Sequence, residues 1–260
     1  MRITRYWDAA SNAARYGVIE GETIREIAGH PYGAIETTKN VHPLGSAKIL
    51  AACEPTKIVA GGANYHGHLK EVGLAIPEVP VFFLKPPSAL IGPDQAVEYP
   101  PETKRLEYEG ELAVVVKHPM RRTPPEDVPK HILGYACVND VTARDIQVTG
   151  GNLLHLCHSK SFDTFCPMGP WIETELNPNN VDIELKINGQ VRQKKTNTDD
   201  MIFTVEQMVS YFSHVMTLLP GDLILTGAPP GVGRMEVDDK IELTIQGIGT
   251  LRHTVVAGTP

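Results

Sequence analysis

The sequence lacks the segments that mark a membrane or secreted protein. None of its 260 residues lie in a run approaching the roughly 18 apolar residues of a membrane span. Residues 1–8 contain no apolar signal core. The four cysteines, Cys53, Cys137, Cys157 and Cys166, form neither a CxxC pair nor a zinc-binding spacing. We therefore expect a cytoplasmic protein whose thiols are reduced and buried.

Basic residues and nucleotide-binding motifs are also scarce. The chain has 24 Lys and Arg against 31 Asp and Glu, a net charge of −7, which argues against nucleic-acid and anionic-membrane partners. It has no GxGxxG sequence, Walker loop or GxSxG nucleophile elbow. By contrast, 23 Gly and 21 Pro favour short strands and shaped loops over long helices.

Short strand patterns dominate the chain. Residues 2–6 predict a strand, and the residues around Glu20-Gly21 predict a hairpin. These elements indicate a small N-terminal β-rich domain over residues 1–55, followed by a second domain over residues 56–260. Because strands do not alternate with long helices, we expect a mainly β or α+β fold and no doubly wound sheet.

Two later signals are clearer. Asn188-Gly189 stands between two strand patterns and predicts a hairpin turn. Thr204 and Gln207 form a capping box, and apolar residues at helical spacing follow up to Val215. We interpret the apolar stripe of this helix as core.

The most informative stretch, residues 106–116, predicts one long strand. Its alternation places Glu107, Glu109 and Glu111 on one face, with neighbours about 7 Å apart. Two such carboxylates could converge on a cation, but periodicity cannot choose two of the three. A charged, solvated edge strand would show the same pattern.

A further acid and a possible base lie outside this strand. Asp140 ends an apolar run, where it could supply a third oxygen ligand or cap the short helix expected from Thr142. A carboxylate set of this kind would prefer Mg²⁺ or Mn²⁺ over zinc. His68 and Glu71 share one face of a helical turn, as a general base with its orienting carboxylate or as an exposed surface pair. No Cys or further His at useful spacing supports His66 and His68 as zinc ligands.

Six motifs follow in a fixed order along the chain. They are Asn64-Tyr65-x-x-His68-x-x-Glu71, Phe83-Leu-Lys-Pro, Tyr108-Glu-x-Glu-Leu-Ala-Val-Val, Gly134-Tyr…Asn139-Asp-Val-x-Ala-Arg-Asp, Lys160-Ser-Phe-Asp-Thr-Phe and Leu219-Pro-Gly-Asp…Thr226-Gly-x-Pro-x-Gly-Val-Gly. Over about residues 57–257 this set resembles the fumarylacetoacetate hydrolase family. The resemblance implies a twisted β-roll core beside the small N-terminal domain, a homodimer, and one bound Mg²⁺ or Mn²⁺.

The resemblance also implies roles for individual residues. It assigns the metal ligands to Glu109, Glu111 and Asp140, and leaves Glu107 as a neighbour. His68 and Glu71 become the catalytic pair on a mobile segment. The other implied catalytic or substrate-facing residues are Lys160, Tyr65, Lys85 and Gln147, together with Ala228 in the Gly/Pro loop. The family usually has Thr in place of Ala228, so this chain lacks a hydroxyl that often contacts substrate.

Charge balance agrees with a small anionic substrate. Three carboxylates and a divalent ion leave a charge of −1, which Lys160 neutralises and Lys85 would make positive. We therefore predict a Mg²⁺- or Mn²⁺-dependent hydrolase that cleaves a C–C bond of a 2,4-dioxo acid, acylpyruvate- or fumarylpyruvate-like, through a metal-stabilised enolate. The alternatives are a 2-oxo acid decarboxylase or enol–keto isomerase, acting on oxaloacetate or a 2-hydroxyhepta-2,4-diene-1,7-dioate. A non-catalytic metal-binding protein of the same fold is a more remote alternative.

Overall fold

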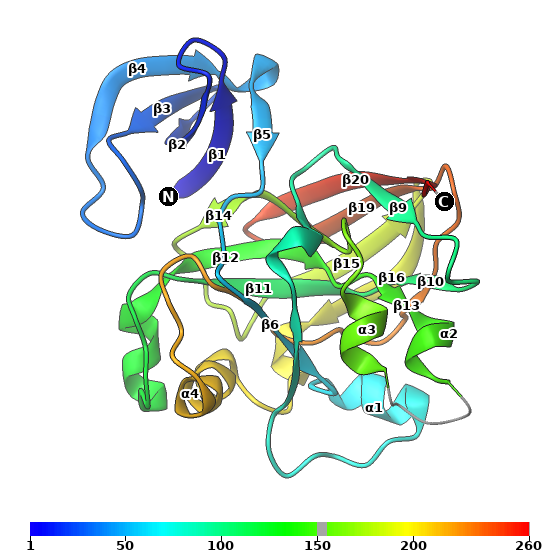
Figure 1. Ribbon diagram of the computed structural model, residues 1–260. Coiled ribbons are helices and arrows are strands. Elements are labelled where there is room, and N and C mark those ends of the chain that lie inside the picture. The colour runs from blue at the N-terminus through cyan, green and yellow to red at the C-terminus, as the bar shows by residue number, and fades with distance from the viewer. Residues whose placement is uncertain (150–154, 260) are drawn as a thin grey trace.

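The computed structural model describes residues 1–149 and 155–259. Strands make up most of its regular structure, and the few helices are short (Figure 1). The predicted mainly β or α+β fold is confirmed. In the part of the chain that the structure describes, no helix is both long and apolar enough to cross a membrane.

The N-terminal strands gather together, apart from the rest of the chain in the view of Figure 1. They are β1 (Arg2–Asp8), β2 (Ala13–Glu20), β3 (Thr23–Ile27), β4 (Thr37–Pro43) and β5 (Lys48–Leu50). The predicted hairpin is confirmed, since β2 and β3 pair antiparallel around Gly21, whose φ is +60°. Strand β1 also pairs with β14 (Cys166–Glu173), so these strands continue the main sheet. A domain boundary near residue 55 stays a prediction.

The main sheet runs in the order β4-β3-β2-β1-β14-β12-β11-β17-β6-β7, with β5 and β8 paired at its sides. Its remaining strands are β6 (Ile58–Gly62), β7 (Val81–Lys85), β8 (Leu90–Ile91), β11 (Gly110–Val116), β12 (Ile132–Asn139) and β17 (Leu223–Leu225). Strand β11 lies between β12 and β17, and all its residues are buried. The alternative of a solvated edge strand is therefore wrong.

The predicted long strand over residues 106–116 is interrupted at Glu109. Its first part, β10 (Leu106–Tyr108), belongs to a three-stranded sheet with β13 (Thr142–Ala143) and β18 (Gly233–Arg234). Its second part, β11, belongs to the main sheet. Local alternation is the same on both sides of Glu109, so periodicity could not show that the partner strands change there.

A five-stranded sheet packs beside the main sheet, in the order β16-β15-β19-β20-β9. Its members are β9 (Ala96–Tyr99), β15 (Asp182–Ile187), β16 (Gln190–Asn197), β19 (Lys240–Ile245) and β20 (Gly249–Ala257). The predicted turn at Asn188-Gly189 is confirmed, and both residues have positive φ, as a two-residue hairpin turn of this kind requires.

The described helices are α1 (His66–Val72), α2 (Arg144–Gln147), α3 (Leu156–Lys160) and α4 (Val205–Val215), with 3-10 turns at Leu44–Ser46, Pro87–Ala89, Pro125–His131 and Thr198–Asp200. The capping box that predicted α4 is present, with Thr204 and Gln207 bonded to each other's backbone amides. The short helix expected from Thr142 begins at Arg144 instead, because Thr142 and Ala143 pair with β10.

The prediction that the cysteine thiols are free and buried is confirmed for three of the four cysteines. All four have free thiols, and Cys53, Cys137 and Cys166 are buried. The expectation that all four are buried is wrong for Cys157, which is exposed on α3. Cys157 lies on the exposed side of α3, whereas Ser159 and Lys160 of the same helix are buried.

Candidate metal centre and active site

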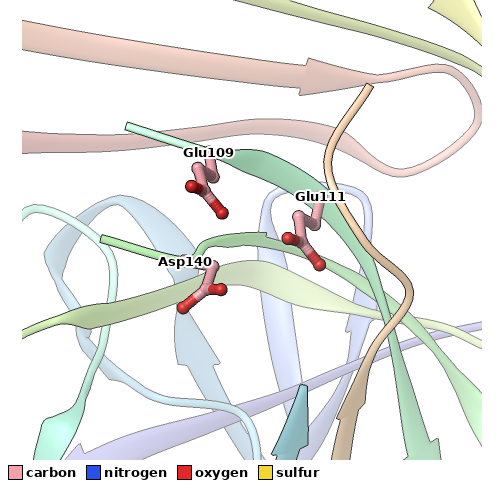
Figure 2. Close-up of side chains that lie close together, drawn as sticks. All are labelled: Glu109, Glu111 and Asp140. Atoms are coloured by element: carbon pink, nitrogen blue, oxygen red, sulfur yellow. The ribbon is translucent and has the colours of Figure 1, made fainter. Parts of the chain in front are cut away.

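Three carboxylates meet where two neighbouring strands of the main sheet carry acids at one end. Glu109 directly precedes β11, Glu111 is the second residue of that strand, and Asp140 directly follows β12 (Figure 2). One oxygen from each lies within 4.8 Å of the others, and all three side chains are buried. Among residues 1–149 and 155–259, this is the one cluster of at least three His, Cys, Asp or Glu with such spacing.

The backbone around Glu109 sets this convergence. The Glu109 N–H donates to Asn139 Oδ1 at 2.8 Å, and the Glu109 carbonyl accepts from the Asp140 N–H at 2.8 Å. Because these bonds join the two acid-bearing segments directly, Glu109 and Asp140 are held side by side. Glu111 is fixed separately, since its Oε2 accepts the Gly227 N–H at 2.7 Å.

Two buried lysines lie against the carboxylates. The Lys160 Nζ donates to Glu109 Oε2 and to Asp140 Oδ2, each at 2.6 Å. The Lys85 Nζ lies 2.7 Å from Asp140 Oδ1 and donates to the Val141 carbonyl at 3.3 Å. Both residues come from motifs of the family resemblance, and the structure brings them to the predicted ligands.

Arg144 is a further cation of the site that the sequence analysis did not single out. Its Nε donates to Glu107 Oε2 at 2.7 Å, and its other guanidinium nitrogens donate to Glu109 and Gln147. Glu107 pairs in addition with Arg105. Arg144 stands four residues after Asp140 in the same motif, and that spacing is the signal that could have drawn attention to it.

These contacts set the charges of the carboxylates. Burial alone would raise the pKa of Glu109, but Lys160 and Arg144 lower it to about 2. Among residues 1–149 and 155–259 no Lys or Arg contacts Glu111, so burial and then the charges of Asp140 and Glu109 hold its pKa well above the usual range. Burial would lower the pKa of Lys160, whereas Asp140 and Glu109 raise it, so its ammonium stays charged.

The donor set fits a hard divalent cation. It consists of carboxylate oxygens alone, the ligands that Mg²⁺ and Mn²⁺ prefer. The buried Asp140 Oδ1 accepts no hydrogen bond from the described residues, although the Lys85 Nζ is close. Burial and the charges of Asp140 and Glu109 raise the pKa of Glu111, and a cation bound among the three carboxylates would favour its ionised form. The cluster could therefore hold a metal ion.

The predicted pair of His68 and Glu71 lies on the short helix α1. The His68 Nδ1 is 3.7 Å from Glu71 Oε2, beyond hydrogen-bond distance, and it has no hydrogen-bond partner among the described residues. Glu71 Oε2 accepts the Gly231 N–H at 3.0 Å, and Asp200 Oδ2 accepts the Gly67 N–H at 2.9 Å. The helix is thus tied at both ends to other segments.

The remaining predicted substrate residues are all buried. The hydroxyl of Tyr65 is without a hydrogen-bond partner in the described part of the chain, and burial followed by the charge of Glu111 raises its pKa. Gln147 accepts from Arg144. Ala228 follows Gly227 in the loop that holds Glu111, so a larger side chain there would stand next to the cluster.

The chain is a β-rich protein with a buried carboxylate cluster that could hold a metal ion. Comparison with known proteins identifies its family. Residues 57–256 match the family described as fumarylacetoacetate (FAA) hydrolase C-terminal, and residues 1–51 match the one described as Rv2993c-like, N-terminal. The chain belongs to the fumarylacetoacetate hydrolase family, as the six motifs predicted.

Similar proteins carry isomerase, tautomerase and hydrolase names. A 5-carboxymethyl-2-hydroxymuconate delta-isomerase from Mycobacterium smegmatis is 40% identical, with a TM-score of 0.91 over 99% of this chain and 100% of its own. The mitochondrial oxaloacetate tautomerase FAHD2A of Bos taurus is 36% identical over 86% of this chain and 74% of its own. A maleylpyruvate hydrolase from Sphingobium sp. SYK-6, solved with manganese(II) and pyruvate, is 31% identical, with a TM-score of 0.80 over 100% of both chains. Members of the family are enzymes.

Proposed function

We propose that the protein is a Mg²⁺- or Mn²⁺-dependent enzyme that interconverts the enol and keto forms of a small 2-oxo dicarboxylic acid. The observation that carries this proposal is the balance of charge around the cluster. The charges of four buried carboxylates, Glu107, Glu109, Glu111 and Asp140, are balanced by those of four cations, Lys85, Lys160, Arg144 and Arg105. Among the described residues these cations contact every one of the four carboxylates except Glu111. A divalent ion would then leave two positive charges, which a dicarboxylate would neutralise.

The residues of this chain have separate tasks in such a reaction. A divalent cation held by Glu109, Glu111 and Asp140 would supply Lewis-acid polarisation of the 2-oxo group. Lys160 places a fixed ammonium beside two of those carboxylates, where it stabilises the negative charge of an enolate oxygen. His68 takes the proton from the carbon next to the 2-oxo group, and Glu71 stabilises the imidazolium that forms. Delivery of that proton to the enolate oxygen completes the enol, and the reverse transfer from oxygen to carbon gives the keto form.

The names of the similar proteins support this choice. The isomerase and the tautomerase are 40% and 36% identical to this chain, and the hydrolase is 31% identical. Ala228 also supports it, because the loop lacks the hydroxyl that the family usually offers to a substrate there. Decarboxylation of a 2-oxo dicarboxylic acid would break a C–C bond, release CO₂ and leave a shorter enolate whose charge lies on the same oxygen, without an attacking water.

Cleavage of a C–C bond is the second candidate, and the placement of His68 favours it. Its Nδ1 faces Glu71, so its Nε2 is free to take a proton from water. That water would attack the distal carbonyl of an acylpyruvate, and the electron pair of the broken C–C bond would become the enolate that Lys160 stabilises.

The homodimer implied by the resemblance and a cytoplasmic location stay predictions.

The test compares substrates and metals in one series. The purified protein is stripped with chelator, resupplied with Mn²⁺ or Mg²⁺, and assayed for oxaloacetate enol–keto conversion, oxaloacetate decarboxylation and acylpyruvate cleavage. We expect metal-dependent turnover that is fastest for enol–keto conversion. Activity that persists after chelation would contradict the metal mechanism, and faster acylpyruvate cleavage would favour the second candidate. No turnover of any substrate would favour a non-catalytic metal-binding protein.

The variant Lys160→Met separates catalysis from metal binding. Removing an ammonium next to two metal carboxylates removes a competing cation, so Mn²⁺ affinity should be retained or increased. Turnover should fall by about 100-fold or more, because one electrostatic stabiliser of the enolate is lost. Near-normal turnover in this variant would exclude the role proposed for Lys160.

A further inference from the structure

A buried histidine on strand β20 contacts the residue that joins the two acid-bearing segments. His253 is 2% exposed, and its Nε2 lies 3.0 Å from the Nδ2 of Asn139. Asn139 in turn accepts the Glu109 N–H on its Oδ1 at 2.8 Å. His253 therefore connects to the backbone of Glu109 through one side chain, although in the described part of the chain it hydrogen-bonds to no carboxylate of the cluster.

The direction of each hydrogen bond follows from the backbone. A peptide N–H can only donate, so the atom of Asn139 that faces Glu109 must be the oxygen. The NH₂ group of Asn139 then faces His253, and the Nε2 of His253 has to be an acceptor. The ring proton must consequently sit on Nδ1, whose nearest acceptor is the Thr254 carbonyl at 3.5 Å.

The surroundings of His253 agree with a neutral ring. Its burial lowers its pKa to about 4. A protonated ring would place an N–H donor against the NH₂ of Asn139 and reverse the preference for the observed amide orientation. The sulfur of Met235, 3.9 Å from the Nδ2 of Asn139, is only a weak alternative acceptor.

The backbone of Glu109 needs this support because it belongs to no strand. It lies in the break between β10 and β11, and the Asn139 Oδ1 and the Asp140 N–H are its partners in the contacts described above. If the amide of Asn139 turned over, its NH₂ would face the Glu109 N–H, and that contact would be repulsive. The Glu109 carboxylate would then lose part of its fixed position relative to Asp140.

We propose that His253 is a positioning residue for the metal centre, which fixes the amide of Asn139 and thereby the ligand Glu109. The proposal rests on the proposed metal dependence of the enzyme. His253 would thus help to position the cluster although it lies 114 positions away from Asn139 in the sequence. Partners of this kind, one step behind the ligands, are worth about 10- to 100-fold in metal affinity.

The test measures Mn²⁺ affinity by titration of the chelator-stripped protein, in the wild type and three variants. His253→Phe fills the space but offers no acceptor, so we expect Mn²⁺ to bind about tenfold more weakly. His253→Gln can present its Oε1 to Asn139, and its affinity should stay within about twofold of the wild type. Val255→Ala is the matched control, because Val255 is buried two residues further along β20 and its side chain has no group that could accept a hydrogen bond from Asn139.

The outcomes separate the two proposals. A wild type that does not bind Mn²⁺ would refute the proposed function itself. A wild type that binds Mn²⁺, together with a folded His253→Phe that binds it equally well, would refute the role of His253 alone. Equal losses in His253→Gln and His253→Phe would also refute it, since the acceptor would then be irrelevant.

A direct measurement on the wild type covers the case in which His253→Phe does not fold. The ¹⁵N chemical shifts of the His253 ring distinguish a protonated from an unprotonated Nε2. We expect the Nδ1–H tautomer at pH 7 with a bare Nε2. A proton on Nε2 would overturn the proposal, because Asn139 could not then be held in the orientation that Glu109 requires.

Discussion

The two parts of the candidate site are built in different ways. The carboxylates Glu109, Glu111 and Asp140 stand at strand ends, are buried, and have backbone or side-chain partners from several segments. His68 and Glu71 stand on a helix of seven residues, and the side chain of Glu71 is 45% exposed. The carboxylates are thus fixed by contacts from several segments, whereas the position of His68 and Glu71 depends on a few contacts.

The difference indicates a division of labour. A metal site needs fixed distances between ligands, and paired strands provide them. A proton-transfer pair must admit substrate and solvent, and a short helix held at Gly67 and Glu71 can move if either contact is broken. Variants that affect one part should therefore leave the other almost unchanged.

The largest losses of metal affinity and turnover should come from a substitution in the carboxylate cluster. Glu109→Gln keeps the size of the side chain but removes a ligand charge, so Mn²⁺ affinity and turnover should each fall by about 1,000-fold or more. Isothermal titration with Mn²⁺ and a steady-state assay measure the two losses. Glu107→Gln is the matched control: it is equally buried and shares Arg144, but it lies outside the three-carboxylate cluster. Equal losses in both variants would show that the cluster has been assigned to the wrong acids.

Variants of the pair His68 and Glu71 on α1 should lose turnover but keep their affinity for Mn²⁺. His68→Ala removes the proposed base, so turnover should fall by about 100- to 10,000-fold. Mn²⁺ affinity should stay within about twofold, since no strand contact of the cluster is lost. Turnover and metal titration on the same preparation check both statements. If turnover remained near the wild-type rate, another group would have to move the proton.

The burial of a neutral His253 should appear in the pH dependence of the free energy of unfolding. The pKa of His253 is about 4 in the folded chain and near 6.5 when unfolded, so the unfolded state binds more protons between these values. Stability therefore decreases as the pH falls below 6.5, by about 2 kcal/mol between pH 7 and pH 5 from this residue. His253→Gln should lack that decrease, and urea unfolding of both metal-free proteins at the two pH values measures the difference. An identical decrease in both would contradict a neutral, buried His253.

The smallest effect should come from the attachment of α1. Asp200→Ala removes the acceptor of the Gly67 N–H, a bond worth about 1 kcal/mol, so kcat/KM should fall about fivefold. Metal affinity should not change, because the hydrogen bond that is lost joins Asp200 to α1 and not to a residue of the cluster. Asp199→Asn, at the exposed neighbouring position, is the control and should behave as the wild type. A change of Mn²⁺ affinity in Asp200→Ala would mean that helix and strands are coupled.

Much of the local structure was predictable from the sequence because its determinants are local. Thr204 and Gln207 fix the start of α4, and Asn188-Gly189 fixes a turn, through contacts within a few residues. The nearness of Glu109, Glu111 and Asp140 was implied by the family resemblance. Alternation alone left Glu107 as an equal candidate, and the structure places that residue with Arg144 and Arg105 instead.

The features that were not predicted depend on partners far away in the sequence. The break at Glu109 arises because β10 and β11 pair with different sheets, and no pattern within residues 106–116 records that change. His253 carries no local signal of its contacts, and the place of Arg144 in a motif does not show which carboxylates it contacts. Their side chains become informative only when β13 and β20 are placed beside the acid-bearing strands.

The position of His253 on β20 also bears on the order in which the protein is made. During synthesis all three carboxylates emerge well before residues 249–257, which pair with β19 and with β9. Until that last described strand docks, Asn139 lacks the acceptor that orients it. We therefore expect a nascent chain to bind metal only weakly, and metal loading to follow completion of the five-stranded sheet.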